Sequence, residues 1–299
     1  MSAAAGKSAS PRYADWKAPA EDSRLLIWPE IDELLRQTEQ NHNLLAAAAA
    51  PRLLGVPLNE LRRQARAWIG AIDPQQPIVA TGHQTELYHP GVWIKDAVIH
   101  FAAERIGGTA WHLAVDTDAP KHLLLRWPGG AMAISDDSRL ATAAWSGLLD
   151  PPTPAHLAQL RQALHSAAEK MGFEPSALKV LEDMARLALQ PTTLSEVLCN
   201  VLHGLDWSLG LRHHALLFSP LCLSPPYLSF AASVLADARR FASHYNQALR
   251  EYRQEQSISG TMRPMPDLFI GPDAVEVPFW LDNLALGTRS RPSVFEECG

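Results

Sequence analysis

The stretch IVATGHQTELYHPGVWIKDAV, residues 78–98, decides the fold that the sequence predicts. Its first residues, 78–80, form a short apolar run that is typical of a buried strand. A polar loop with His83 and His89 follows, and residues 90–105 then combine a proline at the first helical position with apolar residues at helical spacing. The stretch therefore predicts a strand, a loop and an amphipathic helix.

A second apolar run, residues 109–115, follows this helix after a Gly-Gly pair. Strand, helix and strand in this order predict a βαβ unit, whose crossover makes the two strands parallel. Elsewhere the patterns predict helices over 29–50 and 58–69, a hairpin over 121–135, a helical stretch over 153–211, a strand over 215–219, one long helix over 226–254, and extended pieces over 268–270 and 275–280.

These elements predict an α/β fold with a parallel sheet, a helical insertion and flanking helices. Along the chain we expect an N-terminal helical segment over 1–72, the βαβ core with its hairpin over 73–150, the helical insertion over 151–212, and a return to the α/β core over 213–299. No internal repeat or long linker separates them.

The composition narrows the classes of function. The 299 residues are 47% hydrophobic, enough for a sizeable core, and carry a formal charge of −6 with a pI near 6.0. Nucleic acid and anionic membrane both require a basic surface, so we expect neither as a partner. The three cysteines have no paired spacing, and no apolar stretch is long enough to cross a bilayer. We therefore expect a cytoplasmic protein with small-molecule substrates.

Candidate functional residues follow both strands of the βαβ unit. Ligands of α/β proteins bind outside the carboxyl ends of parallel strands, so polar residues at these two positions are expected to line one crevice. The candidate catalytic residues are His83, His89, Asp116 and Asp118, and the candidate ligand-binding residues are Thr81, Gly82, Gln84, Gly91, Lys95 and Lys121.

Each of these residues also has a structural interpretation. A glycine after a strand is often only a turn residue, and a loop histidine is often a surface residue. The combination of two histidines in one loop with an Asp-x-Asp pair at the neighbouring strand end favours a site. The other histidines in helical patterns are interpreted as structural: His42, His100, His156, His165, His203 and His244. His213 and His214 are adjacent in a strand and should point to opposite faces, which disfavours a metal pair.

The start of the helix predicts an anion site. Gly82 would let a ligand approach the backbone, and free N–H groups near Pro90 and Gly91 would face a phosphate or carboxylate. Lys95 lies on the following turn and would add a positive charge. The acidic pair predicts a cation site, because Asp116 and Asp118 alternate along an extended segment and could share a Mg²⁺ ion. The alternative for this pair is an Asx turn that caps the strand end.

Two segments, TGHQTELYHPGVWIKDAVIHFA (81–102) and AWHLAVDTDAPKH (110–122), resemble the core of the cysteine ligases of bacillithiol biosynthesis. In that family a first strand ends in Thr-Gly-Gln-Gln, a Gly-Pro opens a helix that carries a lysine, and a second strand ends in Glu-Asp-His-Asp. Later segments resemble the family's Asn-Gln-Ala helix and the proline-rich region after it, in the same order: HYNQALREYRQEQSI (244–258), MRPMPDL (262–268) and EVPFW (276–280).

The resemblance implies a Rossmann-like core, a nucleotide such as ATP in the crevice, Mg²⁺, and addition of an amino acid such as cysteine to an amino-sugar conjugate through an activated carboxylate. The residues that match the family's motifs are Thr81, Gly82, Gln84, Lys95, Asp116 and Asp118. His83 replaces a glutamine and Thr117 a histidine, which leaves the substrate open. The family continues beyond the position of Trp280 into a coiled coil that supports dimerisation. A homodimer is thus expected, and the chain is either a shortened relative or incomplete.

Three functions from different classes stay open. The favoured one is a ligase-like or group-transfer enzyme. The second is a metal-dependent hydrolase in which His83, His89 and the two aspartates hold a metal-bound water. The third is a non-catalytic remnant that binds a small anion or a partner protein.

Overall fold

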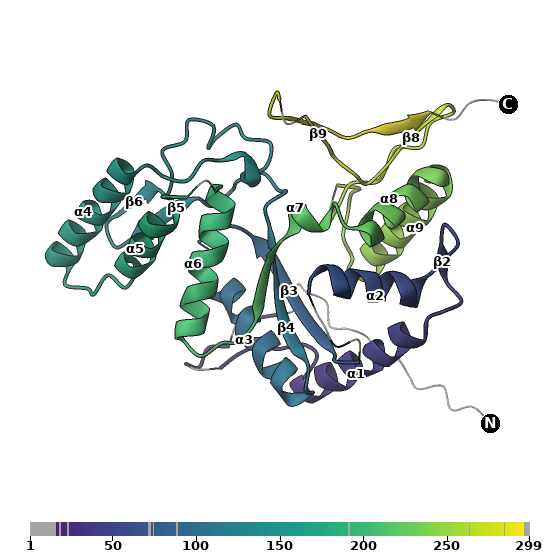
Figure 1. Cartoon of the computed structure of the whole chain (residues 1–299), viewed down its shortest axis with the longest axis horizontal. Helices are drawn as coiled ribbons and strands as arrows, with labels where there is room; N and C mark the ends of the chain where they lie inside the picture. Colours follow the sequence, from purple (N-terminus) through teal and green to yellow (C-terminus); the bar gives the residue numbers. More distant parts are fainter. Residues whose placement is uncertain are drawn as a thin grey trace. The chain divides into compact units, whose positions relative to one another are not determined.

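The computed structural model describes residues 16–17, 19–22, 24–70, 73, 75–87, 89–190, 192–262, 264–283 and 285–295 (Figure 1). Cys298, counted above with the cysteines, lies outside these residues. None of the described helices is both long enough and apolar enough to cross a membrane.

A three-stranded parallel sheet contains the βαβ unit. Its strands are β3 (Ile78–Gln84), β4 (Thr109–Val115) and β7 (His214–Leu217), in the order β3-β4-β7. Helix α3 (Pro90–Arg105) connects β3 to β4 and packs on both strands. The predicted βαβ unit is confirmed, and the fold is mixed α/β.

Strand β3 is longer than predicted. The sequence placed Thr81 and Gly82 in a loop, whereas the strand pairing continues to Gln84, opposite Val115. A Cβ atom at Gly82 would lie 2.9 Å from the backbone oxygen of Leu113, closer than Cβ atoms normally come. The glycine therefore lets β4 approach β3 and does not end the strand.

The predicted helical stretch forms three helices, α4 (Pro154–Met171), α5 (Ala177–Leu187) and α6 (Leu194–Ser208). Their ends follow the predicted capping residues. The Thr153 hydroxyl accepts the N–H of His156 at the start of α4, and Gly172, with φ of 70°, ends this helix. Thr193 and Glu196 form the predicted capping box at the start of α6.

One leucine-rich core joins these helices to the predicted hairpin, β5 (Leu124–Trp127) and β6 (Gly130–Ala133), and to the short helix η2 (Ser146–Leu148). In Figure 1 the hairpin, α4 and α5 lie together beside α6. The most deeply buried members of the core are Ile134, Leu149, Leu160, Leu181, Met184, Leu194 and Leu198. Because α6 contacts β7, this core helps to hold the last strand at the sheet.

The long helix predicted over 226–254 is wrong, since two helices occupy this stretch. Helix α8 (Pro225–Ala236) ends before Asp237, and α9 (Ala238–Glu255) begins after it. Asp237 has φ of −146°, outside the helical region, and its carboxylate accepts the N–H of Arg240. An acidic N-cap thus starts a new helix inside a continuous helical pattern.

The other elements are α1 (Ile31–Ala47), β1 (Arg52–Leu53), β2 (Val56–Pro57), α2 (Leu58–Trp68), α7 (Phe218–Leu221), β8 (Ala274–Glu276), β9 (Leu281–Asn283), β10 (Thr288–Ser290) and β11 (Ser293–Phe295). The three short hairpin-like pairs β1-β2, β9-β10 and β8-β11 are all antiparallel. Both predicted N-terminal helices are present, and the predicted piece 275–280 contributes part of β8.

The described residues divide into two compact units. One contains 16–34, 233–280 and 291–295, with a small core around Val234, Ala242 and Val275. The other contains 35–232 and 281–290, and so holds the sheet, the helices α4 to α6 and every candidate site residue. We expected four consecutive segments with boundaries at 72, 150 and 212. The two compact units instead each combine stretches that are separate in the sequence, so their boundaries differ from the expected ones.

We expect the leucine-rich core around α4, α5 and α6 to contribute to the free energy of unfolding. Leu160 is fully buried on α4, so Leu160→Ala should remove its burial and leave a cavity, lowering the free energy of unfolding by about 2–5 kcal/mol. Urea titration followed by circular dichroism would measure it. Leu189→Ala is the matched control, since Leu189 is 72% exposed. Equal effects of both substitutions would contradict the assignment of this core.

Candidate functional site

A cavity of about 770 Å³ opens at the carboxyl end of β3. Four residues singled out in the sequence line it: His83, Gln84, His89 and Lys121. Three further polar residues also line it, of which the sequence reasoning missed Glu86 and Arg126 and placed His122 beside Lys121 after the second strand. The volume lies within the range of small-molecule sites. This cavity, called the carboxyl-edge cavity below, is the candidate functional site.

His83 and Glu86 form a pair in the wall of this cavity. The Nδ1 atom of His83 lies 3.6 Å from Oε1 of Glu86, whose side chain is 4% exposed. The other carboxylate oxygen of Glu86 accepts the backbone N–H of His122 at 3.0 Å. The carboxylate is thus held in place and faces one nitrogen of the imidazole.

His89 caps helix α3, which changes the predicted anion site. Its Nδ1 accepts the N–H of Gly91 at 3.0 Å, and its backbone oxygen accepts the N–H of Val92. Pro90 has no N–H to offer. The prediction of free N–H groups near Pro90 and Gly91 is therefore wrong. Because Nδ1 accepts a proton, the neutral ring carries its own proton on Nε2, which can donate to a ligand.

The two aspartates have different partners. Both carboxylate oxygens of the buried Asp116 accept hydrogen bonds from Ser219, one from its N–H at 2.8 Å and one from its hydroxyl. Asp118 instead accepts the amide N–H of Gln84 at 2.7 Å. Asp118 therefore joins the carboxyl-edge cavity through Gln84, whereas Asp116 holds the chain after β7.

The Mg²⁺ site at the acidic pair stays a prediction, and both aspartates have hydrogen-bond partners within the chain. Ser219 occupies both oxygens of Asp116, and among the described residues no three His, Cys, Asp or Glu side chains are grouped to hold a metal ion. These contacts are not the Asx turn of the alternative interpretation, because Asp116 is bonded to Ser219, 103 positions away, and Asp118 to Gln84, 34 positions away.

The remaining sequence candidates lie outside the lining of the cavity. Thr81 pairs with His112 within the sheet, and Gly82 contacts Leu113. Lys95 is half-buried on α3 and does not line the carboxyl-edge cavity. Of the ten candidates, the structure thus brings His83, Gln84, His89, Lys121 and Asp118 to one place.

A buried polar cluster lies next to Gln84, and sequence reasoning missed it. Two aspartate–histidine pairs form it: Asp96 Oδ1 lies 2.6 Å from His112 Nδ1, and Asp206 Oδ2 lies 2.9 Å from His213 Nε2. The Trp93 indole also donates to Asp206, at 2.6 Å. These bonds join α3 to β4 and α6 to the start of β7.

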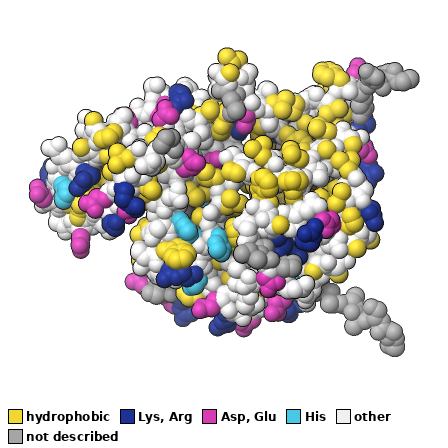
Figure 2. Space-filling model, in the orientation of Figure 1, with side chains coloured by type: hydrophobic (Ala, Val, Ile, Leu, Met, Phe, Trp, Pro, Cys, Tyr) yellow, Lys and Arg dark blue, Asp and Glu magenta, His cyan; other side chains and the backbone are white. Residues whose placement is uncertain are grey.

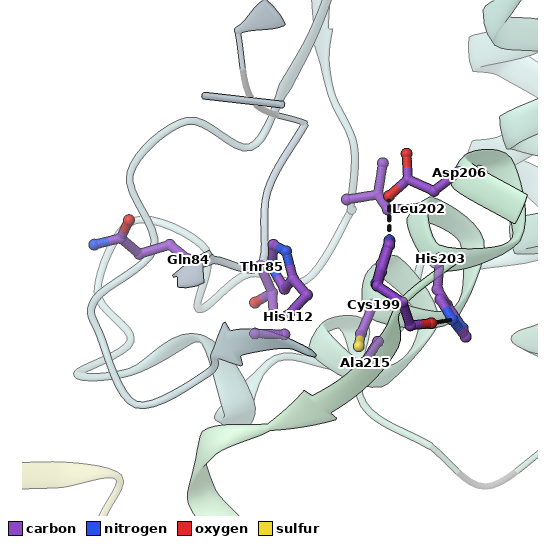
Figure 3. Close-up of a pocket in the computed structure, with 10 residues that line it drawn as sticks. Gln84, Thr85, His112, Cys199, Leu202, His203, Asp206 and Ala215 are labelled. Carbon is purple, nitrogen blue, oxygen red and sulfur yellow. Dashed lines mark hydrogen bonds and ion pairs between the residues drawn. The ribbon is translucent and has the colours of Figure 1, made fainter. Parts of the chain in front are cut away.

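The cluster surrounds an internal cavity of about 10 Å³, roughly the space of one water. Figure 3 shows His203, Asp206 and Cys199 approaching it from α6, and His112 from the sheet. Burial, with smaller effects of Asp116 and Glu196, raises the pKa of the Cys199 thiol to about 11. The thiol is therefore protonated near neutral pH and a poor nucleophile.

Two histidines of the cluster, His203 and His213, have pKa values shifted in opposite directions. Burial lowers the pKa of His203. Burial also acts to lower the pKa of His213, but the hydrogen bond and charge of Asp206, with a smaller effect of Asp96, outweigh it and raise the pKa above 6.5. The raised pKa means that Asp206 favours the protonated form of the His213 ring.

This pair predicts a pH-dependent stability. A histidine whose pKa is raised on folding contributes stability that is fully present below its unfolded value and is lost as the pH rises through its folded value. The unfolding free energy of wild type should therefore exceed that of Asp206→Asn most below pH 6.5, and the difference should shrink as the pH rises above the folded pKa of His213. Urea titrations across this range would measure it.

Asn at position 206 keeps an oxygen that can accept the Trp93 indole N–H, so this bond does not confound the comparison. His213→Gln is the second variant and should remove the same pH dependence. A constant difference between wild type and Asp206→Asn over the whole range would contradict this effect of Asp206 on His213.

Comparison with protein-family models, with curated proteins and with solved structures found no match to this chain. The chemistry of the residues in the carboxyl-edge cavity is therefore the basis on which a function can be proposed.

Proposed function

We propose that this protein is a ligase-like group-transfer enzyme that binds a small anionic substrate in the carboxyl-edge cavity of a Rossmann-like sheet. The observation that carries the proposal is the His83–Glu86 pair in the same cavity as two cations, Lys121 and Arg126, that have no acidic partner among the described residues. A proton acceptor beside an anion site is what transfer of an activated acyl or phosphoryl group to an amine requires.

His83 would take the proton. In transfer to an amine, the nucleophile loses a proton as the new bond forms, and His83 lines the cavity where the nucleophile would sit. Glu86 would stabilise the resulting imidazolium from 3.6 Å, and its bond from the His122 N–H keeps it in position. Glu86 acts through His83 and is a positioning residue.

Lys121 and Arg126 would hold the anionic group. Both are exposed side chains in the cavity lining, and neither forms a hydrogen bond or ion pair with a described residue. Unpaired cations on one wall favour a phosphate or carboxylate. The Nε2–H of His89 adds a neutral donor on the same cavity.

The resemblance to cysteine ligases supports the choice of reaction class. It suggests an amino acid such as cysteine and an amino-sugar conjugate as substrates, with a nucleotide such as ATP to activate the carboxylate. The nucleotide phosphates would meet Lys121 and Arg126. The Mg²⁺ ion that the resemblance suggests stays a prediction, and no role in the reaction is assigned to it. The homodimer that the resemblance suggests stays a prediction, which sedimentation would test.

The metal-dependent hydrolase is less well supported. It requires His83, His89, Asp116 and Asp118 to surround one ion, whereas Ser219 occupies Asp116, and Gly91 donates to His89. A non-catalytic anion-binding protein would use the same cations as the ligase. Only turnover separates these two, since a binding protein has no need of the His83–Glu86 pair.

A kinetic comparison tests the role of His83. With the amino-acid, nucleotide and amino-sugar combination that wild type turns over, His83→Gln should lower kcat by about 10²–10³ and leave KM nearly unchanged. Glu86→Gln should lower kcat less than His83→Gln does, because the imidazolium formed in the reaction loses its carboxylate partner.

His165→Gln is the matched control, an exposed histidine on α4. Full activity of His83→Gln with an unchanged pH profile would exclude proton transfer by His83. If wild type turns over none of these substrates, the anion-binding protein becomes the better account.

A binding experiment tests the cations separately from catalysis. Calorimetry with pyrophosphate, a probe of anion binding alone, should show about tenfold or more weaker affinity for Lys121→Ala and for Arg126→Ala. Lys170→Ala on the outer surface of α4 is the control and should bind as wild type does. Equal affinity of all four proteins would exclude this anion site, whatever the outcome for His83.

A further inference from the structure

A second cavity, of about 420 Å³, opens at the amino end of the same sheet. It is formed by the last turns of α3, the start of β4, the end of α6 and the residues that lead into β7. The described residues that line it all differ from those that line the carboxyl-edge cavity. Figure 2 shows histidine side chains gathered close to hydrophobic and basic side chains on the face that carries α3, α6 and β7. We call it the amino-edge cavity.

Arg212 provides a fixed positive charge in this cavity. Its Nη1 donates to the backbone oxygen of Trp207 at 2.7 Å, and its guanidinium carbon lies 4.7 Å from the centre of the Trp207 ring. No acidic side chain among the described residues forms an ion pair with it. A guanidinium held on a carbonyl and an indole keeps its other N–H groups for an anion.

His100 links α3 to Arg212. Its Nδ1 forms a hydrogen bond with the backbone of Arg212, whose nitrogen lies 3.2 Å and whose oxygen lies 3.3 Å away. The same bond ties the end of α3 to the segment before β7, and with it fixes the position from which the Arg212 side chain starts.

Aromatic rings form much of the remaining wall. Trp207 is 48% exposed, and the ring of His214 stacks on Trp111 with centroids 4.5 Å apart. Half-exposed and stacked rings offer flat surfaces, which favour a planar ligand over a branched aliphatic one. The wall therefore selects for shape, while Arg212 selects for charge.

Glu104 limits the charge that the cavity can accept. It lies on the last turn of α3, is exposed, and lines the cavity without pairing with Arg212. Its carboxylate would repel a second negative charge on the ligand. Among the described lining residues, Arg212 is the one arginine or lysine and Glu104 the one carboxylate, a balance that favours a monoanion over a phosphate dianion or a polyphosphate.

From this geometry we propose that the amino-edge cavity is a second ligand site, specific for a planar aromatic monocarboxylate. The carboxylate lies on Arg212, and the ring lies against His214 and the part of Trp207 that Arg212 leaves exposed. The site is separate from the proposed group-transfer reaction, whose substrate binds at the other end of the sheet.

Ligand-observed NMR and calorimetry on the full chain, with benzoate as the probe, test this site. Wild type should bind benzoate in the millimolar range or better, and bind benzamide, cyclohexanecarboxylate and inorganic phosphate more weakly. Arg212→Gln should weaken benzoate binding by about tenfold or more, whereas Arg186→Gln, an exposed arginine on α5, should not change it.

Two further variants make the result decisive. Lys121→Ala should leave benzoate binding unchanged. If this variant no longer binds benzoate, benzoate binds in the carboxyl-edge cavity and the proposal is overturned. Glu104→Gln should tighten benzoate binding by removing the repulsion. If Arg212→Gln does not fold, Glu104→Gln decides: tighter binding supports the site, and unchanged or weaker binding overturns it. No benzoate binding to wild type, or equal binding to wild type and Arg212→Gln, also overturns it.

Discussion

The in-register parallel pairing of β3 with β4 is the constraint on which the rest of this structure depends. It runs from Ile78 opposite Thr109 to Gln84 opposite Val115, so both strands end at the same level. The glycine at position 82 permits this pairing, because a side chain there would collide with the backbone oxygen of Leu113. Because the two strands end together, the residues after them, Glu86 and Asp118, meet at one edge.

The buried aspartates show how the elements around the sheet are held. An isolated carboxylate inside a protein is costly, and the cost is offset only when its oxygens are hydrogen-bonded or paired. Asp206 receives the Trp93 indole on one oxygen and His213 on the other, and so links α3, α6 and the approach to β7. Removing one partner would leave a buried charge without compensation, which makes this cluster more sensitive to substitution than an apolar contact of equal size.

The sequence predicted most elements well where the deciding contacts are local. The proline at the start of α3, the capping box at Thr193 and the glycine that ends α4 act within one turn of the chain, and each predicted boundary is confirmed. The break at Asp237 was missed because the helical pattern runs through it, and only the cap geometry reveals two helices. Strand β3 was predicted too short because Gly82 was taken as a turn residue, whereas its role depends on Leu113 in another strand.

The candidate site was predictable to a smaller extent, for the same reason. His83, Gln84 and Lys121 follow from their place at strand ends, which the βαβ pattern fixes. The engagement of Asp116 by Ser219 spans 103 positions in the sequence, and that of Trp93 by Asp206 spans 113. No periodicity reports such distant pairs. Glu86 was within reach, since it lies three positions after His83, but its burial is a property of the folded loop.

The two ends of the sheet differ in charge in a way that follows from what each end contains. At the carboxyl end, the acidic residues Asp116 and Glu86 are turned to partners of their own, so Lys121 and Arg126 leave the cavity with a net positive lining. At the amino end, Arg212 and Glu104 both stay exposed to the cavity and nearly balance. A ligand with several negative charges is therefore attracted by Lys121 and Arg126 at the carboxyl end, whereas Glu104 repels it at the amino end. The two proposed anion sites thus lie at opposite ends of one small sheet, and among the described residues they have no lining residue in common.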